Sequence, residues 1–236
     1  MSDVAILHLI VDPLCGWTYA AAPLFRQAMA QPGLRLKLHA GGLFVGSQRK
    51  AVDAAFRQQL QQFDRQIAAI SGQPFAPAYA DVLLQQADFV LDSLPPIRAL
   101  LAGAALGADP VLLLERMQQH YYQHGRNITE TAVLVQIAVE AGLLAADFHR
   151  TYLMLEPALV TAHLQQSRQL LQQIGGQGYP SAALVTAAGQ WQPIALASYY
   201  QQPAAFGQFL QQWLAQQQCK PKISSATDRV ALTCDA

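Results

Sequence analysis

The sequence predicts an α/β domain that is interrupted by a large α-helical insertion. Three observations predict it: a strand–helix–strand pattern over residues 4–39, helical patterns over 49–173, and a return to two strands and a helix over 181–217. Hydrophobic residues make up 52% of the 236-residue chain and charged residues 13%. This composition supports a sizeable core, and it excludes a disordered or collagen-like chain.

The first three elements are expected to form a β-α-β unit. Residues 4–11 are a short run of mostly aliphatic and β-branched residues, which favours a buried strand. After a turn, a helix is expected from about Trp17 to Ala30, and Pro and Gly at 32–33 end it. Residues 34–39 alternate between apolar and basic side chains, the pattern of a half-buried strand. The crossover between the two strands should be right-handed.

The insertion is expected to contain helices and no long strand. Turn signals rich in glycine, proline, serine and asparagine separate its helical segments. No fixed period relates the segments, so they do not form a tandem repeat. The expected helices cover residues 49–70, 78–90, 95–107, 109–123, 129–142, 145–152 and 156–174.

After the insertion, the sequence predicts a hairpin and a closing helix. Strands are expected at 181–186 and 191–196. Pro193 indicates that the second strand lies at a sheet edge, because proline cannot donate to a strand ladder. The closing helix is expected over 198–217, with an apolar face made of Phe206, Phe209, Leu210, Trp213 and Leu214.

These elements divide the chain into two domains and a tail. Residues 1–47 and 175–218 form the α/β domain, which is a small mixed sheet flanked by helices. Residues 48–174 form the inserted α-helical domain, and residues 219–236 form a polar C-terminal tail.

Charge and segment composition exclude several partners. Fifteen basic residues balance fifteen acidic ones, and no basic stripe is present, so we expect no nucleic acid and no membrane surface as partner. No apolar run approaches the ~20 residues of a membrane-spanning helix. The first residues lack the basic start and cleavage site of a signal peptide, which predicts a cytoplasmic protein.

Cys15 is the residue most suited to chemistry. It stands where the first strand ends and the first helix begins, the place where open α/β sheets put their sites. Unpaired N–H groups and the helix dipole there favour a thiolate, so the pKa of Cys15 is expected to fall below the ~8.5 of a free cysteine. The hydroxyl of Thr18 can hydrogen-bond that thiolate, and Trp17 can shield one side. The alternative is an inert cysteine buried in a tight turn.

The segment Asp-Pro-Leu-Cys-Gly-Trp-Thr-Tyr, residues 12–19, resembles the active-site segment of the DsbA family of thioredoxin-fold proteins, especially its cytoplasmic FrnE-like branch. The usual form there is D-P-x-C-x-W-C-Y. Residues 178–181, Gly-Tyr-Pro-Ser, match the loop with the family's cis-proline, and residues 39–43 look like its segment after the second strand. The resemblance covers most of the chain, and it implies a thioredoxin-like fold with a large α-helical insertion.

The sequence departs from the family at its second active-site cysteine, where it has Thr18. A dithiol site releases a trapped mixed disulfide by internal attack, which a monothiol site cannot do. Turnover then needs an outside thiol such as glutathione, or a resolving thiol at Cys219 or Cys234. The resemblance also implies that the Tyr179–Pro180 bond is cis and that it offers the backbone of Tyr179 to a bound peptide or glutathione.

The resulting prediction is a monothiol thiol–disulfide oxidoreductase or isomerase. Cys15 attacks a disulfide, Thr18 stabilises its thiolate, and Trp17, Tyr179 and Pro180 contact the partner. Protein or small-molecule disulfides are the expected substrates, with glutathione as co-substrate, no bound cofactor and no metal. A homodimer is left open.

His120 and His124 share one helix face, a spacing that can bind a metal, but no further ligand completes a site. A solvated helix end is the interpretation that we favour for this pair. For Cys219 and Cys234, the alternative to a resolving role is that both are exposed tail cysteines without a function.

Three other functions fit parts of the sequence. A kappa-type glutathione transferase or isomerase shares the inserted thioredoxin-like architecture, although it typically has serine where Cys15 stands. A chaperone or peptide-binding module could keep the groove without the redox cycle. Residues 15–18, Cys-Gly-Trp-Thr, locally resemble the C-G-F-S of monothiol glutaredoxins, which hold an iron–sulfur cluster between two subunits.

Overall fold

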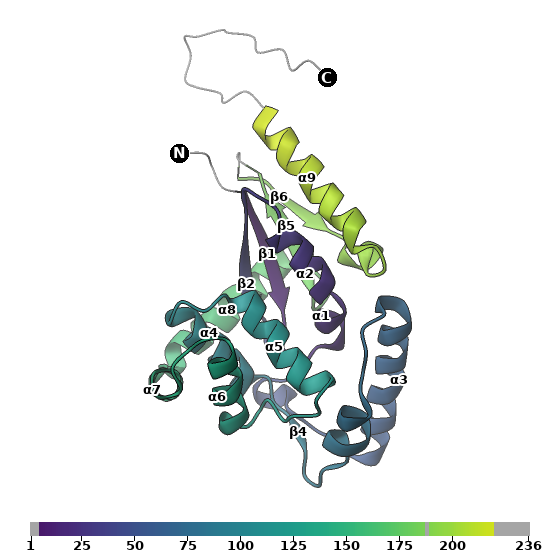
Figure 1. Cartoon of the computed structure of the whole chain (residues 1–236), viewed down its shortest axis with the longest axis vertical. Helices are drawn as coiled ribbons and strands as arrows, with labels where there is room; N and C mark the ends of the chain where they lie inside the picture. Colours follow the sequence, from purple (N-terminus) through teal and green to yellow (C-terminus); the bar gives the residue numbers. More distant parts are fainter. Residues whose placement is uncertain (1–4, 187–188, 220–236) are drawn as a thin grey trace.

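A four-stranded mixed sheet lies at the centre of the computed structural model, which describes residues 5–186 and 189–219. The strand order is β2-β1-β5-β6. Strand β1 (Ala5–Val11) pairs in parallel with β2 (Leu34–Ala40) and antiparallel with β5 (Ser181–Val185), and β6 (Trp191–Ile194) closes one edge (Figure 1). The predicted parallel pair and the edge position of the strand with Pro193 are therefore confirmed.

The two faces of β1 pack against different helices. Leu7 and Leu9 are fully buried in one cluster with side chains of α2 (Ala22–Met29) and α9 (Pro203–Cys219). Ile10 points to the opposite face, where it packs with Leu170 and Ile174 at the end of α8 (Pro157–Gln173). Successive side chains of a strand alternate between faces, so a single apolar strand anchors helices on both sides.

The first predicted helix is divided into two helices in the structure. Helix α1 covers Gly16–Ala20 and α2 begins at Ala22, whereas a single helix was expected to Ala30. Pro23 lies at the start of α2. Because proline lacks an N–H and its ring clashes with the carbonyl one turn before it, a continuous helix cannot pass through this position.

The insertion contains five further helices, and four of them gather at one end of the sheet (Figure 1). They are α3 (Ala54–Ser71), α4 (Leu94–Ala105), α5 (Pro110–Tyr122), α6 (Thr131–Glu140) and α7 (Ala145–Met154), with α3 standing apart from the others. The helices predicted in these regions are confirmed within a few residues of their bounds, apart from the start of the first. Residues 50–51 form β3 (Lys50–Ala51), and α3 starts only at Ala54, after the N-cap Asp53.

The prediction of an α-helix over residues 78–90 is wrong. A π-helical turn at Ala78–Val82 and a 3-10 turn at Leu83–Gln85 replace it, and β4 (Val90–Leu91) pairs with β3. Tyr79, Leu83 and Leu84 are almost completely buried. Placing all three side chains in the core overrides the helix preference of the segment, because burial outweighs the few tenths of a kcal/mol of local propensity.

The closing helix also starts later than predicted. Residues Leu196–Tyr199 form a 3-10 turn, and α9 begins at Pro203. Proline is favoured in the first turn of a helix, where its missing N–H has no partner to lose. The expected apolar face is confirmed, because Phe206, Leu210 and Trp213 are buried.

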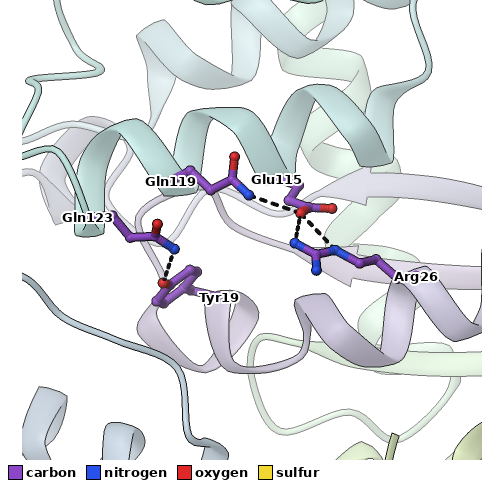
Figure 2. A network of polar contacts seen from close by, with 5 residues as sticks. All are labelled: Tyr19, Arg26, Glu115, Gln119 and Gln123. Carbon is purple, nitrogen blue, oxygen red and sulfur yellow. Dashed lines mark hydrogen bonds and ion pairs between the residues drawn. The ribbon is translucent and has the colours of Figure 1, made fainter. Parts of the chain in front are cut away.

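Helix α5 of the insertion packs against α1 and α2 through polar contacts as well as apolar ones. Arg26 Nε donates to Glu115 Oε1 at 2.8 Å, and Gln123 Nε2 donates to the hydroxyl of Tyr19 at 2.7 Å (Figure 2). Tyr122, which is almost fully buried, donates its hydroxyl hydrogen bond to the carbonyl of Leu14 at 2.8 Å. The insertion thereby supports the turn that precedes Cys15.

One large buried cluster contains side chains from the strands, from α2 and α9, and from the insertion. The domain boundaries at residues 47–48 and 174–175 stay a prediction. Within the described ranges, no helix is both long and apolar enough to cross a membrane.

Candidate active site

Cys15 lies directly after the turn that follows β1, as the N-cap residue of α1. The turn is held by the N–H of Cys15, which donates to the carbonyl of Asp12 at 3.1 Å, and by the N–H of Leu14, which donates to Asp12 Oδ1 at 2.9 Å. Cys15 is only 8% exposed. Its thiol donates to the carbonyl oxygen of Tyr179 at 3.2 Å.

Tyr179 reaches Cys15 because of the strand register. Ser181 begins β5 opposite Ile10, near the end of β1, so the residues just before Ser181 lie beside the turn that follows β1. The Tyr179–Pro180 bond is cis, as the resemblance implied. The loop before β5 places the carbonyl of Tyr179 within hydrogen-bond distance of the sulfur.

Trp17 and Thr18 differ in their exposure to solvent. Trp17 is half-buried, and its ring stacks on that of Tyr200 with centroids 5.5 Å apart. Thr18 is fully buried, and its hydroxyl oxygen accepts a long hydrogen bond of 3.4 Å from the N–H of Asp12. Sequence reasoning missed Tyr200, because nothing in the sequence before α9 indicates a contact with the first helix.

A surface hollow of about 290 Å³ lies beside this aromatic pair. Tyr200 both lines the hollow and stacks on Trp17, so it connects the hollow with the first helix. Its other walls come from the end of α3 and from the segment before α9: Ile70, Ala197, Ser198, Gln201 and Gln202.

The expectation of a lowered Cys15 pKa is wrong for this structure. Burial raises the pKa of the thiol to about 11, and the negative charge of Asp12 adds to the rise. Hydrogen bonds from Thr18 and from the N–H of Trp17 oppose it, as predicted, but they are the smaller effect. Helix α1 has only five residues, so it contributes a weaker dipole than the long helix that was expected.

Asp12 is a fully buried carboxylate that accepts hydrogen bonds from three segments of the chain. Oδ1 accepts hydrogen bonds from the N–H of Leu14 and from the hydroxyl of Ser93, both at 2.9 Å, and Oδ2 accepts one from the N–H of Leu43 at 2.7 Å. Burial raises the pKa of Asp12 to about 6, although these donors oppose the rise. Asp12 thus connects the Cys15 turn with the loop after β2 and with the residue before α4.

A second buried carboxyl, Asp64, lies next to the same turn. A Cβ atom built on Gly16 would lie 3.6 Å from Asp64 Oδ1, so the carboxyl borders the first residue of α1. Burial raises the pKa of Asp64 to about 7, and its Oδ2 has no hydrogen-bond partner. The sequence carries a signal for this residue, because Asp64 falls on the same helix face as Leu60 and Ile67.

Arg168 of α8 lies on the other side of the site. Its Nε donates to the carbonyl of Gly41 at 2.9 Å, and its Nη2 donates to the carbonyl of Gly42 at 3.1 Å. A Cβ on Gly41 would lie less than 3.0 Å from the ring of Tyr179, so only glycine allows that ring to pack here. Arg168 was not predicted as a site residue.

The histidines do not form a metal centre in the part of the chain that the structure describes, where no group of three or more His, Cys, Asp or Glu side chains could hold an ion. The interpretation of a solvated helix end is wrong for His120. It is buried, and its Nε2 lies 2.7 Å from Glu140 Oε2. His124 is exposed, as expected.

The two other predicted thiols lie outside the part of the chain whose side chains the structure describes. Cys219 is the last residue of α9, and its side chain lies outside the described residues. Cys234, like the rest of the predicted tail from residue 220, also lies outside them. A resolving role for either thiol stays a prediction.

Comparison with protein-family models finds no match, and comparison with curated protein sequences finds none either. Solved structures do match. The cytosolic disulfide reductase DsbM from Pseudomonas aeruginosa is 35% identical with a TM-score of 0.83, over 89% of this chain and 99% of that one. The chain belongs to the DsbA family. The predicted thioredoxin-like fold and the predicted class of thiol–disulfide oxidoreductase are thereby confirmed.

Two further structures extend the comparison. DsbM has also been solved with GSH, and that structure matches at 35% identity with a TM-score of 0.81, again over 89% of this chain and 99% of that one. A putative protein disulfide isomerase from Nitrosomonas europaea shares the DsbA-family fold at 20% identity, with a TM-score of 0.73, over 90% of this chain and 98% of that one.

Proposed function

We propose that the chain is a monothiol DsbA-family enzyme that exchanges disulfides through Cys15 with glutathione. The observation that carries this proposal is the pairing of the Cys15 thiol with the carbonyl of Tyr179, beside a cis-proline, while Thr18 stands where a second thiol would. A single sulfur beside a backbone carbonyl, with no second thiol in its first turn, suits the capture of one disulfide at a time.

The same pairing explains how a thiol with a raised pKa becomes reactive. A hydrogen bond donated by S–H stabilises the protonated form. When the main chain of a substrate donates its own N–H to the carbonyl of Tyr179, that donor competes with the S–H group and weakens its hydrogen bond. The N–H groups of Trp17 and Thr18 then favour the thiolate, so the substrate itself promotes the deprotonation of Cys15.

The exchange consists of two balanced thiol–disulfide steps. The thiolate of Cys15 attacks a mixed disulfide between glutathione and a substrate thiol, which forms a bond between Cys15 and glutathione and releases the substrate as a thiolate. The thiolate of a second glutathione then attacks that bond, restores the Cys15 thiolate and leaves as glutathione disulfide. In the net reaction the substrate sulfur is released as a thiolate, and one reduced glutathione is oxidised to glutathione disulfide together with the glutathionyl group that the mixed disulfide carried.

Two observations favour glutathione as the outside thiol. Thr18 cannot attack a disulfide, so release from Cys15 needs another sulfur. The DsbM structure that contains GSH shows that a protein 35% identical to this one accommodates glutathione. Because DsbM is described as cytosolic, we also place this enzyme in the cytoplasm, where reduced glutathione is available.

Mass spectrometry tests the proposal directly. The purified protein is treated with glutathione disulfide and then with reduced glutathione, and intact mass and peptide mapping follow each step. We expect one glutathione on Cys15 after the first step and its removal after the second, while a Cys15→Ser protein carries none at this position. An unmodified Cys15 would overturn the proposal.

The same maps test the two other thiols. A disulfide between Cys15 and either Cys219 or Cys234 would assign a resolving role to the tail and would replace glutathione in the second step. Conjugation of glutathione to an electrophile by the Cys15→Ser protein would instead support the kappa-type transferase.

A further inference from the structure

We propose that Arg168 binds a carboxylate of the disulfide substrate and thereby gives the enzyme a preference for acidic disulfides such as glutathione disulfide, an assignment that rests on the proposed exchange at Cys15. Arg168 belongs to α8, and it lies next to the cis-proline loop through its contacts with the Gly41–Gly42 turn and with Tyr179.

The guanidinium is held in one position by backbone atoms. Nε and Nη2 donate to two successive carbonyls, those of Gly41 at 2.9 Å and Gly42 at 3.1 Å. A Cβ on Gly42 would lie 3.3 Å from Nη2, so the side chain lies closely along the turn. A preorganised cation loses less side-chain entropy when it binds a ligand than a free surface arginine does.

Tyr179 connects Arg168 with the reacting sulfur. The ring of Tyr179 packs on Gly41, and the side chain of Arg168 is close enough to lower the pKa of the Tyr179 hydroxyl against the opposing effect of burial. The carbonyl of the same Tyr179 accepts the hydrogen bond of the Cys15 thiol. A substrate that binds to the backbone of Tyr179 therefore lies on the residue whose ring adjoins Arg168.

The charge of Arg168 has no carboxylate partner among the described residues. Arg26, Arg49 and Arg150 each form an ion pair, whereas Arg168 contacts neutral carbonyls and its side chain is exposed. Asp12 is the acid near Tyr179, but its oxygens already accept hydrogen bonds from Leu14, Ser93 and Leu43. Arginine has five N–H donors; two of them bond the carbonyls of Gly41 and Gly42, and Arg168 also hydrogen-bonds the side chain of Tyr179, which leaves donors for a ligand.

A carboxylate is the group that this arrangement recognises. Arginine binds carboxylates through charge-assisted and often paired hydrogen bonds, which are stronger than those between neutral groups. Glutathione disulfide carries carboxylates at both ends of each tripeptide, flanking the sulfur. Cystamine, a disulfide of similar reactivity, carries amines and no carboxylate, so it cannot make this contact.

The test measures how fast Cys15 forms a mixed disulfide with glutathione disulfide and with cystamine, by intact mass at one pH. The variants are Arg168→Gln and Arg168→Lys, and Arg35→Gln is the matched control, because it removes the same charge from an exposed arginine of β2. We expect Arg168→Gln to slow the reaction with glutathione disulfide about tenfold and to leave that with cystamine unchanged or faster. Arg168→Lys should retain part of the preference.

Each other result would overturn the assignment. If Arg168→Gln slowed both disulfides equally, Arg168 would only support the Gly41–Gly42 turn. If it slowed neither, or if Arg35→Gln had the same selective effect, no specific carboxylate contact would exist. A wild-type protein that formed an adduct with cystamine alone would contradict both this assignment and the use of glutathione. A wild-type protein without any adduct would remove the proposed exchange itself.

Discussion

The thiol of Cys15 lies 3.2 Å from the carbonyl oxygen of Tyr179, although 164 residues separate the two in the sequence. Burial keeps the sulfur protonated at rest, because a thiolate there would have lost its water, and the S–H group has the carbonyl of Tyr179 as its acceptor. The reactivity of this enzyme is therefore expected to depend on what occupies the carbonyl of Tyr179.

The first prediction concerns the position of Thr18. Thr18→Cys places a second thiol in the first turn after Cys15, which should attack a mixed disulfide internally. We expect this variant to lose a glutathione adduct from Cys15 without added thiol and to form an internal disulfide, as measured by intact mass over time. Thr18→Ser is the control and should keep the adduct. An adduct equally stable in all three proteins would contradict the proposed role of the position.

The second prediction concerns the charge of Asp12. In the protein without substrate, alkylation of Cys15 by iodoacetamide should rise with pH and reach half its maximum near pH 11, because only the thiolate reacts. Asp12→Asn removes a negative charge that raises this pKa, so at pH 9 we expect alkylation to be about ten times faster.

Ser93→Ala is the matched control for Asp12→Asn. It removes one hydrogen bond to Asp12 and loosens the same junction, but it leaves the charge in place. Peptide mapping separates Cys15 from the other two cysteines. A similar acceleration in both variants would show that loosening of the turn, and not the charge, governs the thiol.

The third prediction uses two glycines on either side of the site. Gly41→Ala introduces a methyl group that collides with the ring of Tyr179, whereas Gly178→Ala introduces the same group into open space. Overpacking of this kind typically lowers stability by about 1–3 kcal/mol. We expect Gly41→Ala to slow the reaction of Cys15 with glutathione disulfide and to lower the unfolding free energy, and Gly178→Ala to change neither. Equal behaviour of the two variants would refute the packing of Tyr179 on Gly41.

The fourth prediction concerns the pH dependence of stability. Burial raises the pKa of Asp64 to about 7 from 3.8, so the folded state is favoured while this group is protonated, and that contribution is lost as pH rises through about 7. Asp64→Asn cannot titrate. Its unfolding free energy relative to the wild type should therefore increase by roughly 3 kcal/mol between pH 5 and pH 9.

Urea denaturation at the two pH values measures this difference. Asp81→Asn is a suitable control, because Asp81 is exposed on the surface of the same insertion. A difference between Asp64→Asn and the wild type that stays constant with pH would mean that the Asp64 carboxyl is not buried in solution.

Much of the fold could be predicted from the sequence because the relevant signals are local. The alternation over residues 34–39, the apolar run before Cys15 and the proline at 193 each determine an element through neighbouring residues alone. The main wrong prediction, the helix over residues 78–90, has a cause that is not local. Residues 78–90 lost their predicted helix because Tyr79, Leu83 and Leu84 are drawn into the core, and no local pattern describes that competition.

The residues of the candidate site also fall into two groups, those that local motifs predicted and those that only the tertiary structure revealed. Cys15, Thr18 and the loop with Tyr179 and Pro180 were found because they stand in short motifs at the ends of predicted strands. The sequence by itself thus singled out Cys15 as the candidate nucleophile and showed Thr18 at the position of the family's second cysteine. It did not reveal Tyr200 or Arg168, because their contacts with the site join segments far apart in the chain.

The pKa of Cys15 was decided by tertiary structure alone. The local expectation counted N–H donors and the helix dipole, both of which follow from sequence position. Burial of the sulfur has the opposite effect and is larger, and the nearby charge of Asp12 adds to it. Desolvation depends on every segment that closes over the sulfur, so it arises only once the sheet, the cis-proline loop and the insertion have come together.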